Sequence, residues 1–245
     1  MGFLVQKMGI FGVFWQKAGK KAVVFVLVLV LCVSVYNLGK MVYSEQQTDG
    51  YNFVVALDAG HGGIDGGVVG KNTGVKESDI NLDITFLLKD LFESGGFKVV
   101  LTRQNQDGLY GNATDGFKKR DMQKRLDIIQ KAKANLVLSI HCNKFAQTSR
   151  SGPQVFFGDD EGQKLATKIQ TVLNDFTNNS HSALRGDYFM LKCTTSPSVI
   201  VECGFLSNPD EEQKLCDKNY QNQLAQKIYK GVLLYLSADS VVLKK

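Results

Sequence analysis

The chain has 245 residues, of which 44% are hydrophobic and 22% are charged, a balance typical of a folded protein rather than a disordered one. Its formal net charge is +5, but the excess comes from five lysines before Tyr43, where no acidic residue stands. The other 24 basic side chains balance 24 acidic ones, so the net charge gives no support for nucleic-acid binding.

The first predicted element is an apolar segment near the N-terminus. The stretch AVVFVLVLVLCVSVY, residues 22–36, has Ser34 as its only clearly polar member. As a helix it would reach about 22 Å, somewhat short of the roughly 20 residues that comfortably span a bilayer. We expect a membrane anchor or signal segment over residues 22–39, and the absence of a clear cleavage site favours an uncleaved anchor. A buried helix of a soluble protein is disfavoured because no face of the run is polar.

This segment predicts where the rest of the chain lies. By the positive-inside rule residues 1–21 form a basic cytoplasmic N-terminus, and residues from about 44 onward lie outside the cytoplasm. Residues 40–50 are polar and are interpreted as a linker. An exported protein can form disulfides, but the cysteines after the linker lack paired spacing, so we expect mostly free and buried thiols. These are Cys142, Cys193, Cys203 and Cys216, among which a Cys193–Cys203 bridge is left open.

Strand and helix patterns alternate from residue 51 to residue 240. Strands are predicted at 53–58, 97–103, 135–143, 154–157, 188–192 and 198–202. Helices are predicted at 77–94, from 117, around 165–176, at 209–216 and at 219–236. This order predicts one α/β domain over residues 51–240, with a twisted, mostly parallel or mixed sheet of about six strands flanked by helices on both faces.

Two of these helices carry more detailed expectations. The helix at 77–94 is expected to be capped by Ser78 or Asp79. The charged amphipathic helix that begins at residue 117 is expected to bury Met122, Leu126 and Ile129.

Three predicted strands end in a side chain that can bind a metal or transfer a proton. VVALDAGH ends in His61, LVLSIHCN contains His141 and SVIVECG contains Glu202, while Glu77 stands at the entry to the first helix. The carboxyl ends of strands in an open α/β sheet line the ligand crevice, so these residues are expected to share one edge. Two imidazoles and a carboxylate form a common shell of catalytic zinc, and a second carboxylate can act as the base.

A cluster of glycines surrounds His61 and allows more than one interpretation. These glycines would permit a sharp turn that orients His61. Because they lack side chains, they would also leave space for a bulky substrate to approach the metal. The cluster comprises Gly60, Gly62, Gly63, Gly66 and Gly67. Phosphate binding is disfavoured because Asp65 stands where a dinucleotide-binding loop needs its third glycine.

The histidines also have a purely structural interpretation, and the cysteines offer a different catalytic one. His61 and His141 could be ordinary hydrogen-bonded residues at strand ends, and His181, in the polar NNSHS loop, is expected to be solvated. A cysteine nucleophile is the other chemical option. However, if the neighbours of Cys142 and Cys203 face the site, these thiols face the core.

The motifs LDAGHGGIDGG, KESDINLDI, VVLTR, SIHCN and PSVIVECGFLSNPDE, in this order and spacing, resemble the zinc-dependent N-acetylmuramoyl-L-alanine amidases over residues 52–236. The resemblance implies one zinc ion per chain held by His61, Glu77 and His141, with Glu202 as general base and acid. It implies hydrolysis of the amide between N-acetylmuramic acid and L-alanine in peptidoglycan. The alternatives are another zinc hydrolase of peptidoglycan, such as a deacetylase or carboxypeptidase, or a non-catalytic membrane-tethered peptidoglycan-binding module.

Within that family the short single-domain form with an N-terminal apolar segment is most similar to the germination-specific amidases of spore formers. This implies a role in modifying the spore cortex, in the space between the forespore and mother-cell membranes. Cell-division relatives insert a helix that blocks the zinc, whereas here only residues 144–153 separate SIHCN from QVFF. We therefore expect control by expression, by metal occupancy or by an activating or zinc-stabilising partner protein.

Overall fold

A computed structural model of the chain describes residues 25, 27–31, 33–34, 53–112, 114–192 and 194–240. The chain divides into two units, residues 1–48 and 49–245. In the first unit the described residues are helical and exposed. Over the described residues as a whole, no helix combines the length and the apolar character needed to cross a membrane. The predicted N-terminus at 1–21, the linker at 40–50, most of the predicted anchor and Cys193 lie outside the described residues.

In the described part of the second unit, six strands form one mixed sheet in the order β2-β1-β3-β6-β4-β5, which confirms the predicted sheet. Strands β2, β1, β3 and β6 are parallel neighbours, β4 runs antiparallel to β6, and β5 runs parallel to β4. The strands are β1 (Val54–Ala59), β2 (Lys98–Leu101), β3 (Leu136–Asn143), β4 (Gln154–Phe157), β5 (Leu184–Arg185) and β6 (Ser198–Phe205).

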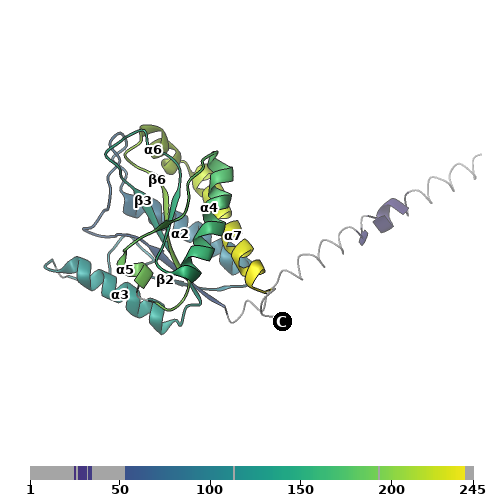
Figure 1. Cartoon of the computed structure of the whole chain (residues 1–245), viewed down its shortest axis with the longest axis horizontal. Helices are drawn as coiled ribbons and strands as arrows, with labels where there is room; N and C mark the ends of the chain where they lie inside the picture. Colours follow the sequence, from purple (N-terminus) through teal and green to yellow (C-terminus); the bar gives the residue numbers. More distant parts are fainter. Residues whose placement is uncertain are drawn as a thin grey trace, which may run out of the picture. The chain divides into compact units, whose positions relative to one another are not determined.

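Helices cover both faces of this sheet, as predicted, but unequally. Figure 1 shows α4 and α7 side by side on one face and α3 and α5 on the other. The first face, which α2 also covers, holds the large hydrophobic core, and the second holds a small one of six buried residues. The helices are α2 (Glu77–Ser94), α3 (Phe117–Lys131), α4 (Asp160–Thr177), α5 (Phe189–Lys192), α6 (Pro209–Cys216) and α7 (Lys218–Ser240).

The alternation of side chains along the central strands explains where a site can form. In β1, Val55 and Leu57 enter the large core, whereas Val54 and Ala56 enter the small one. Residues two apart on a strand share a face. The small-core face therefore continues toward the carboxyl ends of the strands as a polar row, which comprises Asp58 in β1, Ser139 and His141 in β3, and Glu202 in β6.

The strand predicted at 188–192 is wrong, because this stretch contains the single helical turn α5. Met190 and Leu191 are both buried. Two adjacent buried residues fit one helical turn on the sheet better than a strand with alternating faces. The sixth strand is instead β5, whose two residues are both exposed and so give no hydrophobic pattern to recognise.

The predicted cap of α2 is also wrong. The helix begins at Glu77 after Lys76, and no side chain caps it. Neither Ser78 nor Asp79 is needed as a cap because a loop carbonyl takes the role: the Glu77 amide donates to the Val68 carbonyl oxygen at 2.8 Å. The first helical amides are thus satisfied by the glycine-rich loop, which fixes that loop against the start of α2.

Helix α3 follows its predicted position but not its predicted burial. Ile129 is buried, whereas Met122 and Leu126 are only partly covered. The residues buried in their place are Asp121 and Arg125. A charged pair therefore lies under the helix, next to the polar row of the sheet.

Candidate metal centre

Three of the predicted site residues lie together at the carboxyl edge of the sheet. His61 follows β1, Glu77 is the first residue of α2, and His141 lies in β3. One nitrogen or oxygen atom from each lies within 4.8 Å of the others. Glu77 Oε1 is 3.2 Å from His61 Nε2 and 3.0 Å from His141 Nδ1. The structure thus forms a cluster able to hold a metal ion from residues far apart in the sequence.

The geometry of this cluster fits a zinc ion. Tetrahedral zinc with ligand bonds of 2.0–2.1 Å places its ligand atoms about 3.3 Å apart, close to the two separations that involve Glu77. Two imidazole nitrogens and a carboxylate oxygen are also a donor set that zinc accepts. The residues present therefore suit the ion in both spacing and chemistry.

The Glu77 carboxylate is held firmly in the ionised form that a ligand needs. It is 2% exposed, and it accepts hydrogen bonds from the Val68 amide at 2.9 Å and the Cys142 amide at 3.1 Å. Burial alone would raise the pKa of Glu77, but hydrogen bonds to His141 and His61 and their charges hold it well below its ordinary range. The side chain is thus preoriented as an anion.

Two of the glycines near His61 make room for the other two residues of the cluster. A Cβ atom at Gly60 would lie 2.2 Å from His141 Cε1, so the imidazole of His141 occupies the space that a side chain would take. A Cβ atom at Gly67 would lie 2.5 Å from Glu77 Oε2, and Gly67 also has a φ of +68°. The loop therefore lacks side chains at these positions because His141 and Glu77 of the candidate cluster pack directly on its backbone.

We expect Gly60→Ala to lose metal binding, because the added methyl group would displace the ring of His141. The matched control is Gly66→Ala in the same loop, where the nearest atom to a new Cβ is the flexible Lys76 Cδ at 3.2 Å. The zinc content of both variants is compared after dialysis against a fixed zinc concentration. Retention of zinc by Gly60→Ala at the level of Gly66→Ala would contradict this interpretation of the loop.

Glu202 lies on β6 directly beside His141, its register partner on β3. The residue is 9% exposed, and its Oε2 atom has no hydrogen-bond partner among the described residues. Burial raises the pKa of Glu202 to about 7. A buried carboxyl group with an unpaired oxygen and a pKa near neutral pH can both accept and donate a proton.

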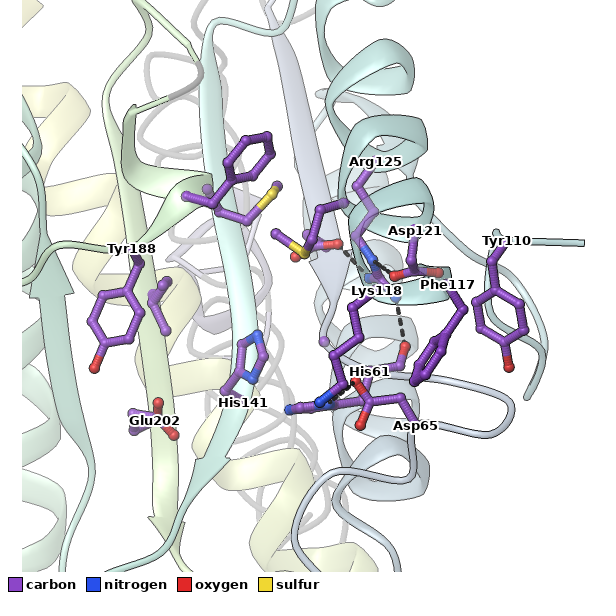
Figure 2. Close-up of a pocket in the computed structure, with 16 residues that line it drawn as sticks. His61, Asp65, Tyr110, Phe117, Lys118, Asp121, Arg125, His141, Tyr188 and Glu202 are labelled. Carbon is purple, nitrogen blue, oxygen red and sulfur yellow. Dashed lines mark hydrogen bonds and ion pairs between the residues drawn. The ribbon is translucent and has the colours of Figure 1, made fainter. Parts of the chain in front are cut away.

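His61, His141 and Glu202 line the same cavity, of about 270 Å³. Figure 2 shows His61 and His141 between Glu202 on one side and α3 on the other. Aromatic side chains border this cavity on both sides, with Tyr110 and Phe117 near the start of α3 and Tyr188 and Phe189 at α5. Glu202 therefore shares one cavity with the two histidines of the candidate cluster.

The most extensive polar network of the site was not predicted from the sequence. Arg125 is 1% exposed, and its guanidinium contacts Asp58 Oδ1 at 2.7 Å and Asp121 Oδ2 at 2.5 Å. The same group donates to the carbonyl oxygens of Ala59 and His61, both at 2.6 Å. A buried ion network thus connects α3 to the end of β1.

A second arginine binds the same backbone segment at the end of β1. Arg103 donates to the carbonyl oxygens of Ala59 at 2.9 Å and Gly60 at 3.1 Å. His61 has a φ of 62°, a left-handed conformation that costs a non-glycine residue about 1–3 kcal/mol. The two guanidinium groups fix three successive carbonyl oxygens, so they hold His61 in this strained conformation.

A pattern in the sequence could have indicated Arg125. Asp121, Arg125 and Ile129 are each four residues apart, so they lie on one face of a helix. That face also carries the apolar residues of the small core. A charged pair in register with buried residues indicates an ion pair under the helix rather than on the solvated side.

The pKa of Asp58 gives a prediction for acid stability. Burial alone would raise it, but the Arg125 charge and hydrogen bonds from Ser139 and Thr102 outweigh burial and lower it from 3.8 to about 2. Because the folded pKa lies below the unfolded one, the carboxylate stabilises the fold above about pH 4 and loses this effect as the pH falls towards 2. The shift corresponds to about 2 kcal/mol.

We therefore expect Asp58→Asn to lower the free energy of unfolding at pH 7 and to flatten its decline at acid pH. Urea unfolding at a series of pH values from about 5 to 2 measures both effects. Asp115→Asn, at an exposed carboxylate, is the control. Equal pH dependence of the two variants would show that Asp58 does not carry the acid sensitivity.

The remaining candidates lie away from the cluster. His181 is partly buried rather than solvated, and its Nε2 atom lies 2.9 Å from the Ser151 carbonyl oxygen. Cys142 and Cys203 are free and buried in the large core, as predicted. Burial raises the pKa of both thiols well above the ordinary value, so neither is suited to act as a nucleophile.

Comparison with known proteins gives a consistent result. Residues 55–233 match the family model described as N-acetylmuramoyl-L-alanine amidase. The germination-specific N-acetylmuramoyl-L-alanine amidase of Bacillus subtilis (strain 168) is 35% identical over 191 residues, which cover 75% of this chain and 80% of that protein.

Solved structures agree with the sequence relatives. The CwlD amidase from Clostridioides difficile, determined in complex with the GerS lipoprotein, has a TM-score of 0.74 and 39% identity, over 76% of this chain and 100% of that chain. The catalytic domain of CwlV, an amidase from Bacillus (Paenibacillus) polymyxa var. colistinus, has a TM-score of 0.67 and 28% identity, over 76% and 98% of the two chains.

Proposed function

This chain belongs to the N-acetylmuramoyl-L-alanine amidases, and we propose that it cleaves peptidoglycan with one zinc ion held by His61, Glu77 and His141. As a member of this family it hydrolyses the amide between N-acetylmuramic acid and L-alanine. The observation that carries the zinc proposal is the His-Glu-His cluster within 4.8 Å, whose two histidines line the same cavity as Glu202 with its unpaired oxygen.

The chain's own residues supply the proton transfers of the reaction. A zinc ion bound at the cluster would polarise the substrate carbonyl and acidify a water molecule. Glu202 takes the proton of the attacking water on its unpaired oxygen and then delivers it to the leaving amine of L-alanine. Aromatic side chains border the cavity on both sides and would contact the substrate there.

Metal removal and restoration test this proposal. Dialysis against a chelator is expected to abolish the release of stem peptides from purified sacculi, and one equivalent of zinc is expected to restore it. His61→Ala should lose both zinc and activity, whereas His181→Ala should keep both because His181 contacts Ser151 away from the cluster.

Product analysis separates the remaining functions. Stem peptides with a free L-alanine amine indicate the amidase reaction. Released acetate would indicate a deacetylase, and released terminal amino acids would indicate a carboxypeptidase. Binding to sacculi without any released product would indicate a peptidoglycan-binding module and would contradict the catalytic role of Glu202.

The relatives also support a proposal for location and role. Cell-wall amidases act outside the cytoplasm, and a germination-specific enzyme is among the relatives of this chain. We propose that this protein modifies spore-cortex peptidoglycan between the forespore and mother-cell membranes, tethered by residues 22–39. Deletion of its gene in a spore-forming host should yield spores that fail to germinate, and a normal germination rate would contradict this role.

The CwlD structure is a complex with a lipoprotein, and this supports a partner for the present chain. We propose that a membrane-associated protein binds here and increases zinc occupancy or activity. Zinc affinity and turnover measured with and without a co-purified partner test the idea. If the chain alone holds zinc tightly and reaches its full rate, no such partner is required.

A further inference from the structure

The carboxylate of Asp65 lies on the side of the His61 ring that faces away from Glu77. Asp65 Oδ2 is 3.1 Å from His61 Nδ1, whereas His61 Nε2 is 3.2 Å from Glu77 Oε1. Figure 2 shows Asp65 beside His61, on the side toward α3 and Lys118. The two ring nitrogens of His61 therefore face two different carboxylates.

We propose that Asp65 is a positioning residue of the metal centre, which accepts the Nδ1 proton of His61 and so presents the Nε2 lone pair to the metal. The inference rests on the proposed zinc site and adds a residue to it. A neutral imidazole carries one proton, and only the nitrogen without it can bind a metal. An acceptor at Nδ1 therefore selects the tautomer that can bind through Nε2.

The loop holds Asp65 in the position that this role requires. The Gly62 amide donates to the Asp65 carbonyl oxygen at 2.8 Å, and the Asp65 amide donates back to the Gly62 carbonyl oxygen at 3.2 Å. The second carboxylate oxygen, Oδ1, accepts from the Gly67 amide at 3.4 Å. This turn brings a carboxylate four residues after His61 back to the histidine ring.

One other group competes for the same oxygen. Lys118 Nζ lies 3.7 Å from Asp65 Oδ2, but the lysine side chain is 69% exposed. An ammonium group so exposed is largely solvated, and a surface ion pair of this kind contributes little. The contact with His61 Nδ1 is shorter, so His61 is the principal partner of this oxygen.

Carboxylate partners behind metal-binding histidines have a measurable effect. Their loss commonly lowers metal affinity about 10–100-fold, because the ring loses both its orientation and part of its basicity. Asp65→Ala is expected to show a loss in this range. Asp65→Asn retains an acceptor oxygen without the charge and is expected to show a smaller loss.

The experiment compares wild-type protein, Asp65→Ala, Asp65→Asn and the control Asp115→Ala. Zinc affinity is measured by competition with a chromophoric chelator. The tautomer of His61 is measured in the zinc-free proteins by ¹⁵N NMR of labelled histidine, at an alkaline pH where the ring is neutral, and the three histidines of the chain keep the spectrum simple. His61→Gln identifies the His61 signals, and urea unfolding of each zinc-free variant confirms that it is folded.

The expected result is a larger share of the Nδ1-protonated tautomer of His61 in the wild type than in Asp65→Ala, and the weakest zinc binding in Asp65→Ala. Partial recovery in Asp65→Asn is also expected. The proposal is overturned if Asp65→Ala binds zinc as tightly as Asp115→Ala, or if its His61 keeps the Nδ1 proton. Failure of the wild type to bind zinc would instead refute the proposed function, and the NMR comparison would still test the contact between Asp65 and His61.

Discussion

Replacing Glu202 by glutamine is expected to lower turnover about 10²–10⁴-fold while zinc content stays unchanged. Glutamine has nearly the same shape as glutamate, but it cannot take a proton from water and pass it to the leaving amine. Glu202 is not one of the three clustered residues, and its unpaired Oε2 atom makes no contact that the substitution would break. The reaction should therefore fail at the proton transfers alone.

Turnover on sacculi and zinc per chain, measured on the same preparation, test this prediction. Glu77→Gln is the matched comparison, because Glu77 belongs to the proposed zinc cluster and its substitution should lower zinc content and turnover together. A Glu202→Gln variant with an unchanged rate would refute the role of Glu202 as the base. A variant without zinc would show that Glu202 is itself a ligand.

Replacing Arg125 by methionine is expected to lower the free energy of unfolding by about 3–5 kcal/mol. Methionine can fill part of the space, but Asp58 would then be a buried carboxylate without its cationic partner. The variant would also release the carbonyl oxygen of His61, whose left-handed conformation Arg125 helps to hold. Zinc affinity should therefore fall as well.

Denaturant unfolding of the zinc-free proteins measures the first effect, and metal competition measures the second. Arg120→Met lies on the same helix at an exposed position and should stay within about 0.5 kcal/mol of the wild type. A double variant, Arg125→Met with Asp58→Asn, should recover part of the lost stability because it removes the unpaired charge. If Arg125→Met is as stable as Arg120→Met, the buried network does not stabilise the fold.

The central sheet and the four candidate site residues could be predicted because both leave strong patterns in the sequence. Buried parallel strands are continuous apolar runs, so a polar residue at the end of such a run is conspicuous. His61, His141 and Glu202 stand at these ends, and their strands are neighbours in the sheet. The order of the motifs supplied Glu77, which lies on a helix rather than at a strand end.

The supporting residues could not be predicted in the same way, because their roles depend on contacts across the fold. The spacing of Arg125 from Ile129 indicates the buried face of its helix, but only the fold shows that Asp58 lies beneath α3 as its partner. The space that Gly60 leaves for His141 likewise depends on the distance between two strands. Neither of these contacts can be inferred from a local sequence pattern.

The errors at the edge of the sheet have a related cause. The α5 turn is apolar and short, and short apolar runs fit a strand and a buried helical turn equally well. The two residues of β5 pair with β4, but both are exposed and carry no recognisable hydrophobic signal. Short edge elements are defined by the partners they meet, whereas long central strands are defined by their own composition.

Anomalous scattering from crystals of the zinc-loaded protein tests the central claim most directly. The account predicts one zinc peak per chain, about 2.0–2.2 Å from ligand atoms of His61, Glu77 and His141, with Glu202 outside bonding distance. A peak at any other group of residues, or a zinc ion bound directly by Glu202, would contradict it.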